Sequence, residues 1–261
     1  MSEILKAVLV LGIMGGALGL ILAIASKVFY VEVDERIEEI TDALPGANCG
    51  GCGFAGCSMC AASIVQGGPI TACHSCSQDT ISQIAEIMGV EDVEIEKEVA
   101  YVRCTGNNGS FDKFSYIGID DCVAAAKVGG LGARSCSYGC VGMGSCIKSC
   151  KFDAISIVDG VAKVDKEKCT GCMACVSVCP KNLIVMIPYD SHTAIPCASE
   201  DIDKETAAAC RKGCIGCGDC TANCPKGAVH VEGNLAVIDY EACVGCTACS
   251  YICPRRLIQN D

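Results

Sequence analysis

The chain has 261 residues, of which 26 are cysteine and none is tryptophan, and its net charge is −11. Such a cysteine share indicates a disulfide scaffold only in short secreted chains, and this chain is long. The excess of acidic residues argues against nucleic acid as a partner. Without its cysteines the hydrophobic share of 51% falls to about two fifths. We therefore expect a group bound to sulfur to replace part of the apolar core.

Residues 7–26 form an uncharged apolar segment between Lys6 and Lys27. A helix of about 20 residues spans roughly 30 Å, the thickness of the hydrocarbon core of a bilayer. We therefore expect a transmembrane anchor over residues 1–30. The alternative is a cleaved signal peptide, because residues 23–25 resemble a cleavage site.

Eight cysteines recur at a constant offset of 74 residues, which identifies an internal repeat. The first set is Cys136, Cys140, Cys146, Cys150, Cys169, Cys172, Cys175 and Cys179, and the second is Cys210, Cys214, Cys220, Cys224, Cys243, Cys246, Cys249 and Cys253. We expect two ferredoxin-like units over residues 132–190 and 206–261, joined by a linker over 191–205. A four-cysteine domain over residues 31–90 and a connecting segment over 91–131 precede them.

Each repeat unit also contains the signal of a β-hairpin, with β-branched residues on both sides of a two-residue turn. The expected strand pairs are 154–158 with 161–165 and 228–232 with 235–239. Residues 77–89 have helical spacing and end in glycine, which predicts a helix. Residues 90–102 alternate in polarity, which predicts a strand. The other segments between cysteines are long enough only for loops and one-turn helices.

The spacing Cys-x2-Cys-x2-Cys-x3-Cys-Pro occurs three times, beginning at Cys169, Cys214 and Cys243. It is typical of bacterial ferredoxins, in which three cysteines bind one [4Fe–4S] cluster and the fourth reaches the neighbouring cluster. The predicted ligands are Cys169, Cys172, Cys175 and Cys150 for cluster 3, Cys214, Cys217, Cys220 and Cys253 for cluster 4, and Cys243, Cys246, Cys249 and Cys224 for cluster 5. Zinc is an alternative, but its sites favour two separate cysteine pairs.

Cluster 2, the companion of cluster 3, has three evident ligands, which are Cys140, Cys146 and Cys179. Met143 stands where the second unit has Cys217, and a thioether is a poor ligand for this iron. One more cysteine has to complete the set, and the candidates are Cys136, Cys122 and Cys104.

A glycine-rich segment upstream suits cluster 1, with zinc as the alternative. Its four predicted ligands are Cys49, Cys52, Cys57 and Cys73. Cys60 and Cys76 remain, and we interpret both as small buried side chains.

The ligand sets of clusters 1 to 5 amount to five [4Fe–4S] clusters. A sixth is a further hypothesis, with ligands from Cys197, Cys210 and two of Cys104, Cys122 and Cys136. The sequence thus predicts an α+β protein with an N-terminal transmembrane helix, a four-cysteine iron–sulfur domain and tandem 2[4Fe–4S] ferredoxin-like domains.

The chain resembles the B subunit of the Rnf membrane electron-transport complex. Three segments carry the resemblance, which are VDERIEEITDALPGANC, CGGCGFAGCSMCAASI and CSYGCVGMGSCIKSCKFDAI. The resemblance runs over essentially the whole chain. It implies that the upstream four cysteines bind the cluster of that family's four-cysteine domain. Because such clusters are normally assembled in the cytosol, we expect a single-pass protein of the cytoplasmic membrane with its iron–sulfur domains on the cytoplasmic side. Such a subunit takes electrons from soluble ferredoxin and passes them to other Rnf-type membrane and peripheral subunits, which move sodium ions or protons.

The chain shows no acid–base pair, nucleophile triad or phosphate-binding loop. We therefore expect no catalytic residues and electron transfer as its only chemistry, within a translocating oxidoreductase. The alternative function is a polyferredoxin subunit of a hydrogenase or dehydrogenase complex, which would lack the apolar helix and the upstream cysteine loop. Docking of an acidic ferredoxin requires a local basic patch. The candidates are Lys148, Lys151, Lys163, Lys166, Lys168, Arg255 and Arg256.

Overall fold

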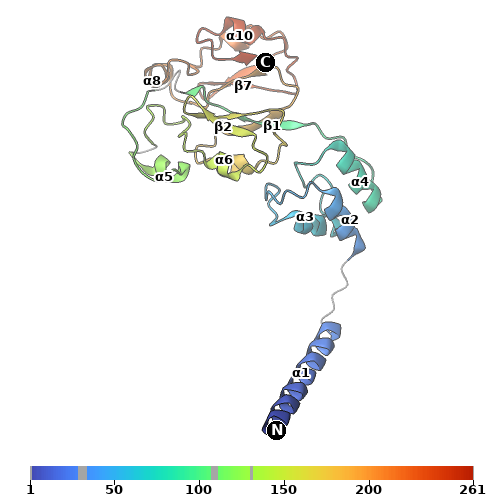
Figure 1. The fold of residues 1–261 in the computed structure, drawn as a ribbon. Coiled ribbons are helices and arrows are strands. Elements are labelled where there is room, and N and C mark those ends of the chain that lie inside the picture. Colours follow the sequence, from blue (N-terminus) through green and yellow to red (C-terminus); the bar gives the residue numbers. More distant parts are fainter. Residues whose placement is uncertain (1, 29–33, 107–110, 130–131, 261) are drawn as a thin grey trace.

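The computed structural model describes residues 2–28, 34–106, 111–129 and 132–260. Helix α1 (Ser2–Val28) stands apart from the rest of the chain (Figure 1). Its stretch Ile4–Lys27 is long and apolar enough to cross a membrane, and the residues whose exposure is described there are not buried. The helix expected over residues 7–26 is therefore present.

Three helices form a small body that contains the upstream cysteines. They are α2 (Glu35–Ala43), α3 (Cys57–Val65) and α4 (Gln78–Met88). Ile40, Ile64, Ile81 and Ile84 are completely buried between them. The helix predicted over residues 77–89 is confirmed as α4. Its ends are fixed by the Ser77 hydroxyl, which accepts from a backbone N–H, and by a left-handed glycine.

The strand predicted over residues 90–102 is wrong for its first eight residues. Only β1 (Glu98–Val102) is a strand, and it pairs antiparallel with β4 (Ile184–Pro188). Residues 90–97 have no partner strand, and Val90 is 50% exposed. The side chain of Gln78 holds this segment, because it accepts from Ile95 N at 2.9 Å and donates to the Val93 carbonyl at 3.0 Å. The alternation of polarity therefore reflects packing on α4 and not sheet pairing.

Both predicted hairpins are present. The strands are β2 (Ile155–Val158) with β3 (Val161–Val164) and β6 (Val229–Glu232) with β7 (Leu235–Ile238). Asp159 and Gly160 have φ values of 50° and 72°, and Gly233 and Asn234 have 49° and 69°. Positive φ at both central residues is the geometry of the tight hairpin turn. The short pair β5 (Thr193–Ala194) and β8 (Gln259–Asn260) was not expected from the sequence.

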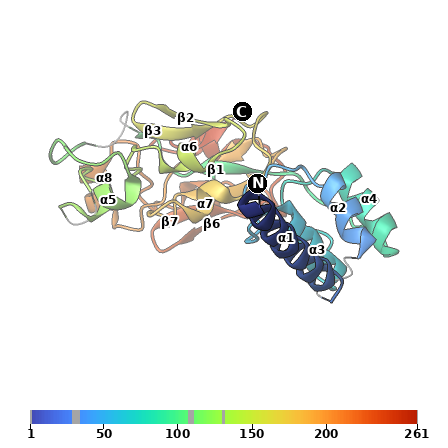
Figure 2. The ribbon, with the colours of Figure 1, turned by 60° about the horizontal axis from the view of Figure 1, so that its bottom comes forward.

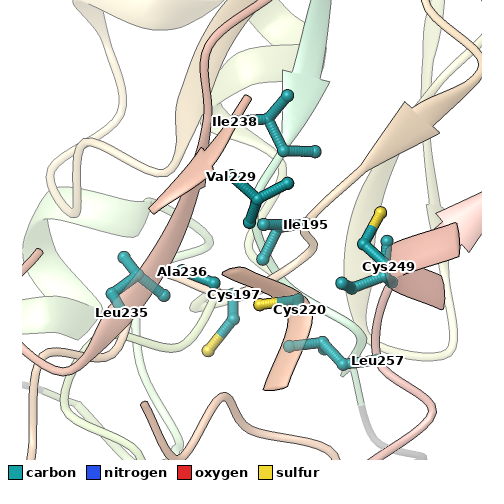
Figure 3. Close-up of a cluster of buried hydrophobic side chains, with 10 residues drawn as sticks. Ile195, Cys197, Cys220, Val229, Leu235, Ala236, Ile238, Cys249 and Leu257 are labelled. Atoms are coloured by element: carbon teal, nitrogen blue, oxygen red, sulfur yellow. The ribbon is translucent and has the colours of Figure 1, made fainter. Parts of the chain in front are cut away.

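Short helices carry many of the downstream cysteines, as expected for segments of this length. They are α5 (Cys122–Lys127), α6 (Ser145–Ser149), α7 (Ala174–Ser177), α8 (Asp203–Ala209), α9 (Asp219–Ala222) and α10 (Ala248–Ile252). Figures 1 and 2 both place α5 and α8 at the end of the ferredoxin-like part of the molecule that faces away from α2 and α4. Ile195 of the linker and Val229 and Ile238 of the second unit form a row of buried side chains (Figure 3). Sulfur atoms of further core residues lie around that row, so aliphatic packing and cysteine positions are coupled.

Candidate iron–sulfur sites

Four hollows of similar size, about 310 to 380 Å³, each have four cysteines in their walls. Two belong to the second unit. One is lined by Cys214, Cys217, Cys220 and Cys253, and the other by Cys224, Cys243, Cys246 and Cys249. These are the crossed sets that the sequence predicts, in which the last cysteine of each motif joins the neighbouring set.

The third hollow, in the first unit, is lined by Cys122, Cys140, Cys146 and Cys179. Of the three candidates, only Cys122 lines the hollow of the incomplete set, although the thiol of Cys104 also lies within electrostatic reach of Cys140. Cys122 begins α5, and its N–H donates to the Ser145 hydroxyl at 2.8 Å. Ser145 in turn donates to the carboxylate of Asp121 at 3.0 Å. These bonds attach α5 to the start of α6.

The fourth hollow combines the remaining candidates, which are Cys104, Cys136, Cys197 and Cys210. The pKa of Cys136 is raised to about 11, chiefly by burial, with contributions from the thiols of Cys197, Cys104 and Cys210. The same four cysteines thus surround one space and lie within electrostatic reach of one another.

The set predicted for cluster 3 is also brought together. Burial raises the pKa of Cys175 to about 12, and the neighbouring thiols of Cys169 and Cys172 add to the effect. Burial likewise raises the pKa of Cys172, and the thiols of Cys49, Cys150 and Cys169 contribute to the rise. Cys172 therefore neighbours its own set and also one cysteine of the upstream domain.

The upstream cysteines lie around the core between α2, α3 and α4. Cys60 is 1% exposed, and its pKa is raised to about 12 by burial and by the thiols of Cys52, Cys73 and Cys57. The pKa of Cys73 is lowered to about 6, chiefly because the Cys76 thiol donates to it, and the pKa of Cys76 is raised accordingly. Cys60 and Cys76 are buried, as interpreted from the sequence, and they flank three of the four predicted ligands.

The glycine-rich loop of the upstream domain meets the first ferredoxin unit at a backbone contact. A methyl carbon added to Gly51 would overlap the carbonyl oxygen of Cys172. One added to Gly171 would lie 2.7 Å from the carbonyl of Glu98. Hydroxyls of Ser75 and Thr170 meet at 3.4 Å in the same region. We call this contact between residues 51 and 172 the seam.

Backbone N–H groups point at several cysteine sulfurs. Ala236 N donates to Cys214 Sγ at 3.4 Å, and Ala100 N donates to Cys169 Sγ at 3.4 Å. Burial acts to raise the pKa of Cys224, but N–H groups of the following residues lower it overall. Such donors stabilise thiolates and influence the potential of a bound cluster.

A single zinc ion and a [4Fe–4S] cluster require different arrangements of the four sulfur atoms. Within the described part of the chain, no three cysteine, histidine or acidic side chains converge closely enough to hold a single metal ion. A structural zinc site requires sulfur atoms about 2.3 Å from one ion. Four thiols around a hollow, with backbone donors aimed at sulfur, fit a [4Fe–4S] cluster, because each thiolate takes a different iron atom.

Similar proteins agree with this interpretation of the cysteines. The chain is 45% identical to the B subunit of the Na⁺-translocating ferredoxin:NAD⁺ oxidoreductase complex of Acetobacterium woodii, over 92% of this chain and 73% of that protein. It is 40% identical to the B subunit of an ion-translocating oxidoreductase complex of Methanosarcina acetivorans, over 92% of each chain. This chain belongs to the Rnf B-subunit family.

The chain also matches a third relative and two family models. It is 39% identical to the B subunit of the proton-translocating ferredoxin:NAD⁺ oxidoreductase complex of Clostridium ljungdahlii, over 92% of this chain and 85% of that protein. A 4Fe-4S dicluster domain matches residues 168–228 and 213–257, and a putative Fe-S cluster domain matches residues 44–75. As a member of the Rnf B-subunit family, the chain is therefore an electron-transfer component of a multi-subunit, ion-translocating oxidoreductase.

Proposed function

We propose that this protein takes electrons from reduced ferredoxin and relays them to the membrane subunits of a sodium- or proton-translocating complex. In this proposal α1 is a single membrane span and the cysteine-rich part lies on the cytoplasmic side. The names of two relatives include ferredoxin as a substrate of their complexes. The polyferredoxin alternative has less support, because the chain has both the apolar helix and the upstream domain that such a carrier would lack.

The observation that carries the proposal is the set of cysteine groups described above. We propose that the sequence-predicted sets hold clusters 1, 3, 4 and 5, and that Cys122 completes cluster 2. When bound, a [4Fe–4S] cluster accepts and releases single electrons. The chain holds the thiolates in place, leaves only Cys217 and Cys246 exposed and directs N–H groups at several sulfurs, which adjusts the energy of the added electron.

The donor docks on the second unit in this proposal. All 26 cysteines are described, and of these only Cys217 and Cys246 are exposed. Both belong to the second unit, which lies at the end of the molecule farthest from α1 (Figure 1). Val244, 60% exposed, and the exposed Lys226 line the same hollow as Cys246. An apolar side chain beside a cation suits an acidic ferredoxin whose charge steers its approach.

Two residues of the expected basic patch are poorly placed for docking. Arg255 is half-buried, and its Nη2 donates to the carbonyl of Cys210 at 2.7 Å. Lys168 lies 3.6 Å from the carboxylate of Asp165, which partly neutralises it. Lys226, which the sequence analysis did not include, has the better position because it adjoins an exposed cysteine.

The test measures electron uptake by the anaerobically purified complex from limiting reduced ferredoxin, followed as loss of visible cluster absorbance. Lys226→Glu is expected to slow uptake severalfold at low salt, with the difference shrinking as salt is added. The matched control, Lys127→Glu, reverses an exposed charge at the end of α5 and should leave the rate unchanged. Failure of ferredoxin to reduce the wild-type complex would refute the proposed donor. Equal rates for the two variants would refute only the docking surface.

A further inference from the structure

The hollow lined by Cys104, Cys136, Cys197 and Cys210 lies between the two ferredoxin-like units. Cys104 follows β1 and Cys136 begins the first repeat, whereas Cys197 lies in the linker and Cys210 begins the second repeat. Its size, about 370 Å³, matches that of the other three hollows. All four cysteines are buried or half-buried. The family models match neither Cys104 nor Cys136.

Cations surround this hollow. Arg103 lines it, and its Nε donates to the carbonyl of Cys197 at 3.1 Å. Arg255 donates to the carbonyl of Cys210 at 2.7 Å. Lys181 Nζ donates to the carbonyl of Ser137, the residue next to Cys136, at 2.7 Å. Four thiolates concentrate negative charge at one place, and these three side chains offset it.

The same cations connect the hollow to its neighbours on both sides. Arg255 also lines the hollow predicted for cluster 4, and Lys181 lines the one assigned to cluster 2. The two residues are equivalent in the internal repeat, because they are separated by the offset of 74. A hydrogen bond also links the hollow to the cysteines of cluster 4, since Cys214 N donates to Cys197 Sγ at 3.3 Å.

We propose that Cys104, Cys136, Cys197 and Cys210 bind a sixth [4Fe–4S] cluster, and that this cluster carries electrons between the two units. The second part rests on the proposed function. Each electron that crosses oxidises the second unit by one electron and reduces the first unit by one, and no bond is made or broken. Because Cys136 begins the first repeat and Cys210 begins the second, the site exists only where both repeats meet.

Iron content tests the site without reference to activity. Six clusters of four iron atoms predict 24 iron atoms in the wild-type chain by native mass spectrometry, whereas five predict 20. The double variant Cys197→Ala/Cys210→Ala should contain 20. The matched control Cys60→Ala, which also replaces a buried cysteine, should keep 24. A wild-type content of 20 overturns the site, and so does a double variant that keeps 24. If the double variant loses more iron because it misfolds, the wild-type count still decides.

Low-temperature EPR of the whole complex tests the role of the bridge. In the double variant, reduced ferredoxin should give signals only from the second unit, whereas dithionite should reduce the clusters of both units. In the wild type and in Cys60→Ala, ferredoxin should reduce both. A double variant in which ferredoxin reduces the first unit at the wild-type rate overturns the bridge. If ferredoxin reduces nothing in the wild type, the proposed function fails while the iron count still tests the site.

Discussion

Gly51 shows how one missing side chain can set the distance between two redox centres. The seam brings its α-carbon against the carbonyl of Cys172, a position that no larger residue can occupy without moving one of the two loops. The loops carry Cys49 and Cys172, which belong to different predicted clusters. In the proposed relay, the length of the electron path from the upstream domain therefore depends on this contact.

We expect Gly51→Ala to keep all its iron but to slow electron transfer between the upstream cluster and cluster 3, and Gly51→Val to slow it more. The added carbon atoms force the two loops apart. Freeze-quench EPR after partial reduction measures how quickly the upstream signal follows that of cluster 3. Ala55→Val, at an exposed position of the same loop, is the control and should behave as the wild type. A Gly51→Val variant with the wild-type rate would show that the seam does not limit transfer.

At this scale the sequence predicted the motif cysteines but not their long-range partners. The crossed sets of the second unit follow from local spacing, and the structure reproduces them. The choice of Cys122 over Cys104 and Cys136 depends on how α5 packs on α6 through Ser145, and spacing carries no information on that contact. The glycine-rich pattern likewise indicated a tight loop but not that it would touch Cys172.

The hairpins are the elements that hold each cluster loop against a strand. A methyl carbon added to Gly142 would lie 2.7 Å from the carbonyl of Gly160 in one turn. The repeat equivalent, Gly216, has the same distance to the carbonyl of Asn234 in the other turn. Each turn thus packs on the loop that carries the first cysteines of its unit.

Gly233→Ala should lower the stability of the second unit by about 1 kcal/mol, the cost of a left-handed conformation for a residue with a β-carbon. Nothing lies within 4 Å of the added carbon, so the effect is purely conformational. Gly233→Asn should cost less, because asparagine tolerates this conformation, and the repeat itself has Asp159 at the equivalent position. The midpoint of thermal loss of cluster absorbance measures both. Equal shifts for the two variants would contradict this explanation.

Hairpins and α4 could be predicted because their signals are local: paired β-branched residues around a turn, or a cap and a final glycine. The pair β1–β4 could not, since its strands come from distant parts of the chain. The error over residues 90–97 has the same origin. Alternating polarity indicates one buried face, and here Gln78 of a helix, not a second strand, supplies the partner.

For the whole molecule, the separation of α1 from the rest predicts that the two parts behave independently. A chain that begins at residue 34 should keep its full iron content, because the residues of Ile4–Lys27 whose exposure is described are not buried. It should no longer sediment with vesicles, whereas the full chain should resist a carbonate wash. Iron analysis and a vesicle pelleting assay measure the two outcomes. A full chain that carbonate removes would contradict the anchor and favour the signal-peptide alternative.

The position of the exposed cysteines has a practical consequence for handling the protein. Oxidants attack accessible thiolates first, and here these are Cys217 and Cys246. Damage by air should therefore start in the second unit, where we propose that the donor docks, before it reaches the less accessible cysteines. A briefly aerated preparation would stay brown and rich in iron and yet accept no electrons from ferredoxin, so colour alone is a poor measure of its quality.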